Sequence, residues 1–390
     1  MKLQFLAFFL FLLTQVNAQA DYKKIHTDAI VVDSHNDILT KVIEKGAVMD
    51  RNLTGETQSD LQRWKEGGVD VQFFSVWCDG NKIKPYAFAN RQMDSLDAVA
   101  KRNPDKIVKV SNTKQLLKAV KQHKLAALFG VEGGHMIEND LAKLQHFYNR
   151  GTRYMTLTWN NSTDWATSAA DETTRKDLKH KGLTVFGKQV VKKMNALGMM
   201  VDISHVGEQT FWDAIHTTTK PVIASHSSVY TLCPHRRNLK DDQIKAVAKN
   251  GGVIQVNFYS GFLDSTYEKK KETFLQKHSS EKDSLIKTGM INFMTEEFLY
   301  GKYMDEVKSM RAPFSLVMQH IEYIIKLVGV DYVGLGSDFD GIESSPLQLD
   351  DVTTYPLITK ALLEKGYSEK DITKVLGGNI LRVLKANEVE

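Results

Sequence analysis

Cysteine is scarce in this sequence, and features of membrane and nucleic-acid-binding proteins are missing. Its 390 residues include only Cys78 and Cys233, so at most one disulfide bond is possible. The formal net charge of +4 is nearly balanced, which argues against a dedicated nucleic-acid surface. Residues 385–390 lack the hydrophobic tail that a lipid anchor signal requires. After residue 20, no apolar stretch is long enough to span a membrane.

The first twenty residues have the pattern of a secretory signal peptide. Lys2 supplies a positive charge, residues 3–13 form an almost unbroken apolar run, and small residues around Ala18 and Ala20 offer cleavage sites. The run is shorter than the roughly 20 residues that a membrane-spanning helix needs. We therefore predict that residues 1–20 are removed and that the protein is exported, to the periplasm or as a secreted protein.

The chain alternates between predicted strands and predicted helices. With 42% hydrophobic and 25% charged residues it has a globular composition, which argues against disorder. Eight short apolar or β-branched runs are separated by segments with helical periodicity. The runs are residues 29–33, 69–77, 125–131, 153–159, 199–203, 221–224, 253–258 and 332–336. This order predicts a parallel sheet, and the count of eight favours a (β/α)8 TIM barrel over a doubly wound open sheet.

One long insertion, at about residues 260–312, interrupts this rhythm between the seventh and eighth runs. On a barrel, a loop after a strand lies at the rim that carries the active site. A lid or interface is one interpretation, and a solvated, partly helical excursion is the other. Without any linker or repeat, residues 21–390 are expected to form a single domain. Two helices within residues 362–384 would close it, with Gly377 and Gly378 between them.

Side chains that can bind metal follow five of the eight runs. They are His35 and Asp37 after the first run, Glu132 after the third, His205 after the fifth, His226 after the sixth and Asp338 after the eighth. The C-terminal ends of barrel strands open into one shared mouth, so these side chains are expected to converge. Imidazoles and carboxylates suit two neighbouring divalent ions. Each motif alone is a weak signal, because a buried histidine usually has an ordinary structural explanation.

Together these motifs resemble those of the renal (membrane) dipeptidase family of the amidohydrolase superfamily. The resemblance covers roughly residues 21–384 and rests on His35-x-Asp37, Gly-Val-Glu132-Gly-Gly, Asp202-Ile-Ser-His205, Ser225-His226-Ser-Ser, Arg236-Arg237-Asn and Gly-Ser-Asp338-Phe-Asp-Gly. It implies a metal-dependent barrel hydrolase with two zinc ions. By this resemblance His35 and Asp37 bind one ion, His205 and His226 bind the other, and Glu132 bridges them.

The resemblance also implies a reaction. A hydroxide that bridges the two zinc ions attacks the peptide bond of a free dipeptide, with Glu132 and Asp338 as catalytic residues and Asp338 passing the proton to the leaving amine. Arg237 matches the arginine that receives the terminal carboxylate of the substrate. Tyr259 is a candidate pocket residue, although an aromatic side chain there is as often a packing residue.

One position departs from the family pattern. Better-known members have a histidine after Tyr-x-Thr-Leu-Thr, where this chain has Trp159, followed by Asn160. That histidine is thought to contact the substrate and the developing oxyanion, whereas an indole donates one hydrogen bond and carries no positive charge. Either Asn160 or the metals take over this task, or the substrate differs from an ordinary dipeptide. Trp159 and Asn160 are both candidate substrate-binding residues.

The two cysteines are expected to be buried free thiols, because both lie beside predicted strand ends. Animal relatives pair the counterpart of Cys233 with a cysteine shortly after the seventh strand, and residues 253–264 contain none. A Cys78–Cys233 disulfide stays open as the alternative, since an exported protein can form one.

Two other functions stay open. One is another amidohydrolase-type reaction, on a lactone, an N-acyl amino acid or a phosphoester. The other is a metal-holding barrel that binds a ligand without turnover, which the tryptophan at position 159 motivates. The expected partner is a small dipeptide and not a nucleic acid, and a homodimer is suggested by analogy with the family alone.

Overall fold

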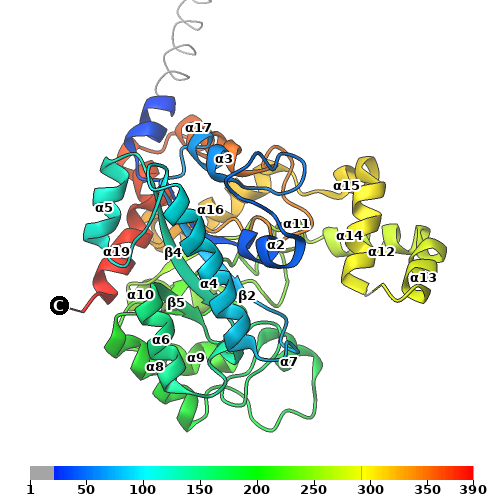
Figure 1. Cartoon of the computed structure of the whole chain (residues 1–390), viewed down its shortest axis with the longest axis horizontal. Coiled ribbons are helices and arrows are strands. Elements are labelled where there is room, and N and C mark those ends of the chain that lie inside the picture. Colours follow the sequence, from blue (N-terminus) through cyan, green and yellow to red (C-terminus); the bar gives the residue numbers. More distant parts are fainter. Residues whose placement is uncertain (1–21, 291, 390) are drawn as a thin grey trace, which may run out of the picture.

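The computed structural model of the chain describes residues 22–290 and 292–389, so the predicted signal peptide lies outside the described residues (Figure 1). Its centre is a parallel sheet with the strand order β1-β2-β4-β5-β6-β7-β8-β9. These strands are β1 (Val32–Asn36), β2 (Val71–Trp77), β4 (Leu125–Glu132), β5 (Thr152–Thr156), β6 (Met200–Asp202), β7 (Ile223–Ala224), β8 (Val253–Val256) and β9 (Val333–Leu335). Eight parallel strands within surrounding helices confirm the predicted (β/α)8 barrel.

The first and last strands meet and nearly close the barrel. Asn36 forms a parallel bridge with Phe339, and the backbone N–H of Asp37 donates to the Phe339 carbonyl over 2.9 Å. The buried carboxylate of Asp33 accepts hydrogen bonds from the N–H of Ser337, at 2.9 Å, and from its hydroxyl, at 2.7 Å. A buried carboxylate is costly unless donors surround it, so Asp33 favours the arrangement in which the two chain ends lie side by side.

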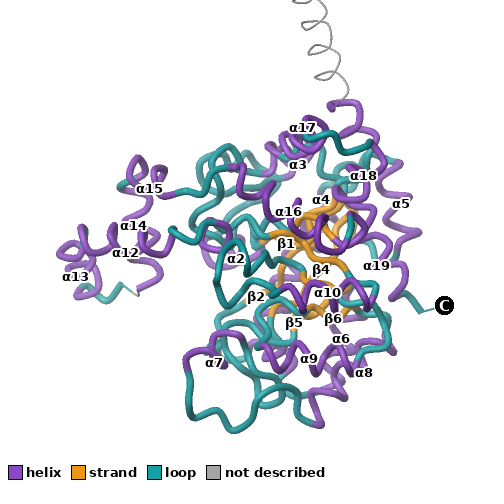
Figure 2. The backbone as a smooth tube through the Cα atoms, turned by 180° about the vertical axis from the view of Figure 1, so that it is seen from behind, coloured by secondary structure: helices purple, strands orange, loops and turns teal. Residues whose placement is uncertain are grey.

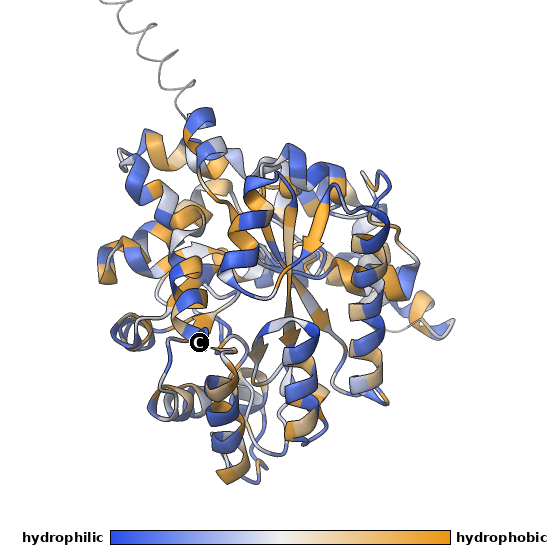
Figure 3. Ribbon diagram, turned by 60° about the vertical axis from the view of Figure 1, so that its left-hand side comes forward, coloured by the Kyte–Doolittle hydropathy of each residue, from blue (hydrophilic) through white to orange (hydrophobic). Residues whose placement is uncertain are grey.

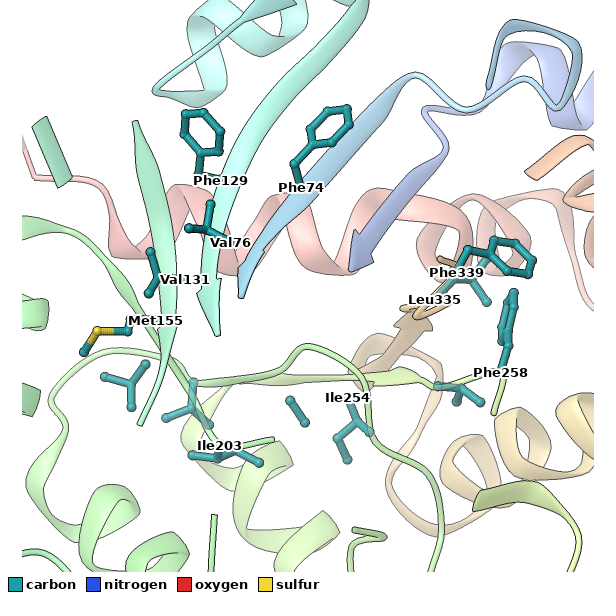
Figure 4. Packing of buried hydrophobic residues seen from close by; sticks show 14 of the residues in the cluster. Phe74, Val76, Phe129, Val131, Met155, Ile203, Ile254, Phe258, Leu335 and Phe339 are labelled. Carbon is teal, nitrogen blue, oxygen red and sulfur yellow. The ribbon is translucent and has the colours of Figure 1, made fainter. Parts of the chain in front are cut away.

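Side chains of β2 alternate between two apolar clusters, as the pleat of a strand requires. In β2, Val71 and Phe73 point into the barrel, where they pack with residues of the other strands. Phe74 and Val76 point outward and belong to the larger cluster between the strands and the helices (Figure 4). Ser75 lies on the inward-facing side, one step above Phe73. Positions near the C-terminal end of a strand therefore reach the mouth of the barrel.

Helices cover the outside of the barrel (Figure 2). Hydrophobic and hydrophilic stripes alternate around many of them, as expected for helices with one buried face (Figure 3). Their bounds are α2 (Ile38–Lys45), α3 (Leu61–Glu66), α4 (Pro85–Arg102), α5 (Thr113–Lys121), α6 (Leu141–Arg150), α7 (Ala169–Thr174), α8 (Val185–Leu197), α9 (Glu208–Thr217), α10 (Asp241–Asn250), α16 (Phe314–Val328), α17 (Pro356–Glu364), α18 (Glu369–Thr373) and α19 (Asn379–Asn387). Across the described part of the chain, no helix has both the length and the apolar character needed to cross a membrane.

One detail differs from the sequence-based expectation. A further strand, β3 (Ile107–Lys109), pairs with the first residues of β4. Three residues are too few to show an alternating pattern, so no signal in the sequence predicted this strand. Gly377 and Gly378 lie between two C-terminal helices, as predicted, in a π-helical turn, Lys374–Gly378, that joins α18 to α19. Gly377 is required there because a side chain would overlap the Ile30 carbonyl of the neighbouring segment.

The insertion after β8 is a group of short helices, residues 260–310, which we call the arm. Its helices are α11 (Ser260–Leu263), α12 (Tyr267–Lys277), α13 (Ser279–Lys287), α14 (Asn292–Lys302) and α15 (Met304–Met310). In Figures 1 and 2, α12 to α15 stand apart from the barrel. The arm packs around an apolar cluster of its own, made of Tyr259, Tyr267, Phe274, Leu299, Tyr300, Val307 and Met310. Lys271 binds Glu343, in the loop after β9, over 2.8 Å, so the arm is tied to the mouth of the barrel.

Candidate metal centre

The predicted metal-binding side chains converge at the mouth of the barrel. Ligand atoms of His35, Glu132 and His226 all lie within 4.8 Å of one another, and so do those of His35, Asp37 and Asp338. The two groups share His35, so they form one continuous cluster. The residues come from strands far apart in the sequence, and only closure of the barrel brings them together.

Glu132 lies at the centre of this cluster, and its two oxygens face different sides. Oε2 lies 3.2 Å from His35 Nε2 and accepts a hydrogen bond from the Ser75 hydroxyl over 3.1 Å. Oε1 lies 2.9 Å from His205 Nε2 and 3.5 Å from His226 Nε2. A carboxylate that presents one oxygen to each of two donor sets has the arrangement of a bridging ligand.

The orientation of His35 is fixed by Tyr154, which reaches across the barrel from β5. The Tyr154 hydroxyl donates to the Ser34 carbonyl over 2.9 Å and lies 2.7 Å from His35 Nδ1. Because the hydroxyl uses its proton on Ser34, it accepts the proton of His35 Nδ1–H, and Nε2 is left with a free lone pair. Gly130 makes room for this contact, since a side chain there would overlap the Tyr154 ring.

The other two histidines are oriented in the same way. Ser225 donates its hydroxyl proton to Asp202 Oδ2 over 2.6 Å and accepts from His226 Nδ1, at 2.7 Å. The Asn160 side-chain carbonyl accepts from His205 Nδ1 at 3.1 Å. Each Nδ1 therefore carries the proton, and each Nε2 presents a lone pair to the centre. Partners of this kind are the usual supports of metal-binding histidines.

This donor set fits divalent cations. The Nε2 atoms of His205 and His226 lie 2.9 Å apart, and two lone pairs at that distance repel unless a cation lies between them. Asp37 Oδ1 is buried and has no hydrogen-bond partner among the described residues. An orphaned buried carboxylate oxygen is costly, so its presence here indicates a missing positive partner. Imidazole nitrogens with carboxylate oxygens form a ligand set that Zn²⁺ accepts.

The electrostatics of the pocket favour an anionic Glu132 and a neutral His205. Burial opposes the anionic form of Glu132, but the neighbouring side chains of His35, His205 and His226 lower its pKa well below the usual value. Burial, reinforced by the charge of Arg237, lowers the pKa of His205 to about 3. Glu132 is therefore an anion and His205 a neutral imidazole at neutral pH.

Asp338 lies at the rim of the cluster. Its Oδ1 is 3.9 Å from His35 Nε2, and its Oδ2 accepts from the Asn257 amide over 2.8 Å. Burial, together with the charges of Asp37 and Glu132, raises the pKa of Asp338 well above its ordinary value. Its backbone has a φ of 62°, a left-handed conformation that is uncommon for a residue with a side chain and that often marks a functional position.

Arg237 lies beside the cluster with most of its hydrogen-bonding capacity unused. The residue is only 5% exposed, and burial lowers its pKa to about 10, so it remains a cation at neutral pH. Its terminal nitrogens make long contacts with the Ser227 hydroxyl, at 3.5 Å, and the His226 carbonyl, at 3.3 Å. Nε has no partner, and no carboxylate in the described part of the chain forms an ion pair with this residue. A buried guanidinium in this state is suited to an anionic ligand.

The structure places the other predicted substrate-binding residues at different distances from the cluster. The Trp159 ring lies 6.4 Å from the ring of His205 and 5.0 Å from that of Trp77, so two indoles lie beside the centre. Asn160 touches His205 Nδ1 on the side away from the cluster. Tyr259 packs in the apolar cluster of the arm, and its hydroxyl donates to Glu343 over 2.8 Å.

Sequence reasoning assigned no role to Tyr154, Ser225, Asp202 or Asn257, although all four hold site residues. Three of them, Ser225, Asp202 and Asn257, are polar residues at or just after the end of a strand, whereas Tyr154 is the middle residue of β5. The contacts depend on distances across the barrel, and periodicity along one strand does not contain them.

Comparison with known proteins identifies the family. Residues 19–390 match the family model of the membrane dipeptidases, peptidase family M19. The chain belongs to this family. It is 34% identical over 394 aligned residues to an uncharacterized dipeptidase of Schizosaccharomyces pombe, covering 95% of this chain and 84% of the relative. As a member of the M19 family the chain is a metallo-dipeptidase, a hydrolase.

Solved structures share the fold of this chain. The probable dipeptidase PvdM from Pseudomonas aeruginosa superposes with a TM-score of 0.79 at 22% identity, over 95% of this chain and 98% of that one. A metallopeptidase from Rhodobacter sphaeroides gives a TM-score of 0.74 at 22% identity, over 92% of this chain and 100% of that one. At this level of identity, the likeness to these two structures concerns the fold alone.

Proposed function

We propose that this M19 family member hydrolyses free dipeptides with two zinc ions held by His35, Asp37, Glu132, His205 and His226. The observation that carries the proposal is the position of Glu132, which turns Oε2 to His35 and Oε1 to His205 and His226. In this arrangement one carboxylate serves two adjacent ion positions.

Two zinc ions, when bound, polarise a carbonyl group and lower the pKa of water. The residues of the chain supply the remaining functions. Arg237, which is buried and has no acidic partner in the described part of the chain, receives the carboxylate of the dipeptide. Its donors limit the substrate to peptides with a free C-terminus at a fixed distance from the scissile bond. Asp338, whose Oδ1 lies 3.9 Å from His35 Nε2, accepts the proton of the attacking water and passes it to the leaving amine.

Trp159 and Trp77 form an apolar wall beside His205. The Rhodobacter sphaeroides metallopeptidase was solved with a phosphinate mimic of the dipeptide L-Ala-D-Ala. That ligand makes dipeptides with a D-residue at the C-terminus candidate substrates for this chain as well. A test panel therefore needs both L,L and L,D dipeptides, with small and with aromatic side chains.

The test combines metal analysis with hydrolysis of this panel. Protein purified without chelator is expected to contain two zinc ions per chain and to release free amino acids from at least one dipeptide. Dialysis against a chelator should abolish hydrolysis and lower the unfolding temperature, and added zinc should restore both. A zinc-loaded protein that cleaves no dipeptide but hydrolyses a lactone, an N-acyl amino acid or a phosphoester would replace this proposal. A loaded protein that cleaves none of them would be a binding protein.

Export remains a prediction from residues 1–20, and the homodimer remains one by analogy. Expression of the full chain in a bacterial host, followed by N-terminal sequencing of protein from the periplasm or the medium, would test the first. A start near Asp21 is the expected result. Light scattering of the purified protein would test the second.

A further inference from the structure

Asn257 follows β8 and lies between Asp338 and the base of the arm. It is fully buried and shares the inward-facing side of its strand with Val253 and Gln255, four and two residues earlier. Its side chain makes two hydrogen bonds. Nδ2 donates to Asp338 Oδ2 over 2.8 Å, and Oδ1 accepts from the backbone N–H of Tyr259 over 2.5 Å.

The hydrogen bond from Tyr259 determines the orientation of the Asn257 amide, and therefore which of its atoms faces Asp338. A backbone N–H can only donate, so the amide oxygen of Asn257 must face Tyr259, and its NH₂ group must face Asp338. Asp338 Oδ2 therefore acts as an acceptor, and Oδ1 is the oxygen that faces His35, at 3.9 Å. Gly341 leaves space on that side, since a Cβ atom there would lie 2.9 Å from Asp338 Oδ1.

Tyr259 is in turn held by the arm. Its ring lies 5.5 Å from the ring of Tyr267 within the apolar cluster of the arm. Its hydroxyl donates to Glu343, which also binds Lys271 of α12 over 2.8 Å. The backbone donor that orients Asn257 thus belongs to a segment fixed by the insertion.

We propose that Asn257 is a positioning residue, which holds Asp338 so that Oδ1 faces the substrate, and that the arm fixes Asn257 through Tyr259. The inference deepens the proposed function and rests on it, because it assigns a support to the residue that moves the proton. Asn257 does not touch the reacting atoms in this scheme. It determines which oxygen of Asp338 does.

The test uses Asn257→Asp and Asn257→Ala in the full chain, with Asn379→Ala as the matched control. Asn257→Asp keeps the size of the side chain and the acceptor for Tyr259, but as a carboxylate it cannot donate to Asp338. Asn379 is also buried and binds two backbone carbonyls, of Val330 and Val333, at the opposite end of β9. Four quantities are compared: kcat, KM, bound zinc per chain and unfolding temperature.

For both Asn257 variants we expect kcat to fall about 100-fold, the size of a typical general acid–base contribution, with KM within about threefold and zinc content as in the wild type. Asn379→Ala should lower the unfolding temperature while kcat stays near the wild-type value. The positioning role is wrong if folded, zinc-loaded Asn257→Asp keeps the wild-type kcat. It is equally wrong if both Asn257 variants lose zinc or fail to fold, since that outcome assigns the residue a purely structural role.

These results separate the inference from the function on which it rests. If the wild-type protein cleaves no dipeptide, both the proposed dipeptidase function and the positioning role of Asn257 are wrong, whatever the variants do. If the wild-type protein cleaves dipeptides and the Asn257→Asp variant has the same kcat, only the positioning role of Asn257 is wrong.

Discussion

The hydroxyl of Tyr154 lies 2.7 Å from His35 Nδ1, although 119 residues separate the two along the chain. Tyr154 comes from β5 and His35 from β1, on different sides of the barrel, so the contact spans its interior. This phenol determines which nitrogen of His35 carries the proton. The metal centre thus depends on a residue that lies in the core and touches no ion in the proposed arrangement.

Tyr154→Phe is therefore expected to weaken zinc binding. The change leaves His35 Nδ1 and the Ser34 carbonyl without their partner, and loss of such a support typically costs about 10- to 100-fold in metal affinity. Competition titration with a chromogenic chelator measures the effect. Tyr148→Phe, on α6 in the outer layer, is the control and should bind zinc like the wild type. Equal affinities for Tyr154→Phe and the wild type would contradict the assigned role.

Arg237→Ala should reduce kcat/KM for free dipeptides by about 10- to 100-fold, mainly through a higher KM, because hydrogen bonds to charged groups contribute about 1.5–3 kcal/mol. Dipeptides with an amidated C-terminus should respond little to the change. The exposed neighbour Arg236 provides the control variant, Arg236→Ala, with kinetics close to those of the wild type. If Arg237→Ala leaves dipeptide KM unchanged, the substrate carboxylate is bound elsewhere.

Because of His320, we expect the protein to lose stability in acid. It is fully buried on α16, Nδ1 accepts from the Val229 N–H over 3.0 Å, and Nε2 donates to the Leu263 carbonyl over 3.2 Å, so the imidazole is neutral. Burial lowers its pKa to about 4, from the ordinary 6.5. The unfolded chain therefore takes up the proton first. Neutral His320 makes its full contribution to the free energy of unfolding above pH 6.5. This contribution is lost as the pH falls, by about 3 kcal/mol at pH 4.

Urea unfolding between pH 7.5 and 4 measures this dependence. His320→Gln should be less stable than the wild type at pH 7.5, because the two hydrogen bonds are disturbed, but its stability should fall less steeply with pH. His216→Gln, at an exposed position of α9, is the matched control and should follow the wild-type curve. Parallel curves for His320→Gln and the wild type would mean that His320 is not the group that titrates.

Cys78 and Cys233 are both buried free thiols, which agrees with the expectation from their positions beside strand ends. Burial raises the pKa of Cys78 to about 12 and that of Cys233 to about 11. Since the thiolate is the reactive form, neither should react with a thiol reagent in the native protein within minutes. In denaturant two thiols per chain should be titrated. A count of zero under those conditions would reveal a disulfide instead.

Much of the fold could be predicted from the sequence because barrel strands and covering helices differ in period. The segments 185–197 and 314–328 have helical periodicity and coincide with α8 and α16, and the eight apolar runs overlap the eight barrel strands. β1 extends to Asn36, three residues past the predicted run, because backbone pairing with Phe339 continues where the hydrophobic residues stop. Such pairing depends on two segments together, so the sequence of one segment alone does not show where the strand ends.

The convergence of the candidate ligands could also be predicted, because every parallel strand of a barrel ends at the same face. His35, Glu132 and His226 lie together as that rule requires. The supports of these ligands could not be predicted. Whether Asn160 turns toward the substrate or toward His205, and whether Tyr259 faces the mouth or the arm, depends on side-chain rotamers. Packing decides those rotamers only after the backbone is in place.

The contact between Asp33 and Ser337 joins positions 304 residues apart, so it has a consequence for biosynthesis. A ribosome delivers β1 first and β9 near the end, and domains generally fold as units during synthesis. His35 leaves the exit tunnel early, but its neighbour Asp338 emerges only after β9. The candidate metal-binding cluster is therefore complete only when synthesis is nearly finished, and the proposed zinc ions would bind after that point.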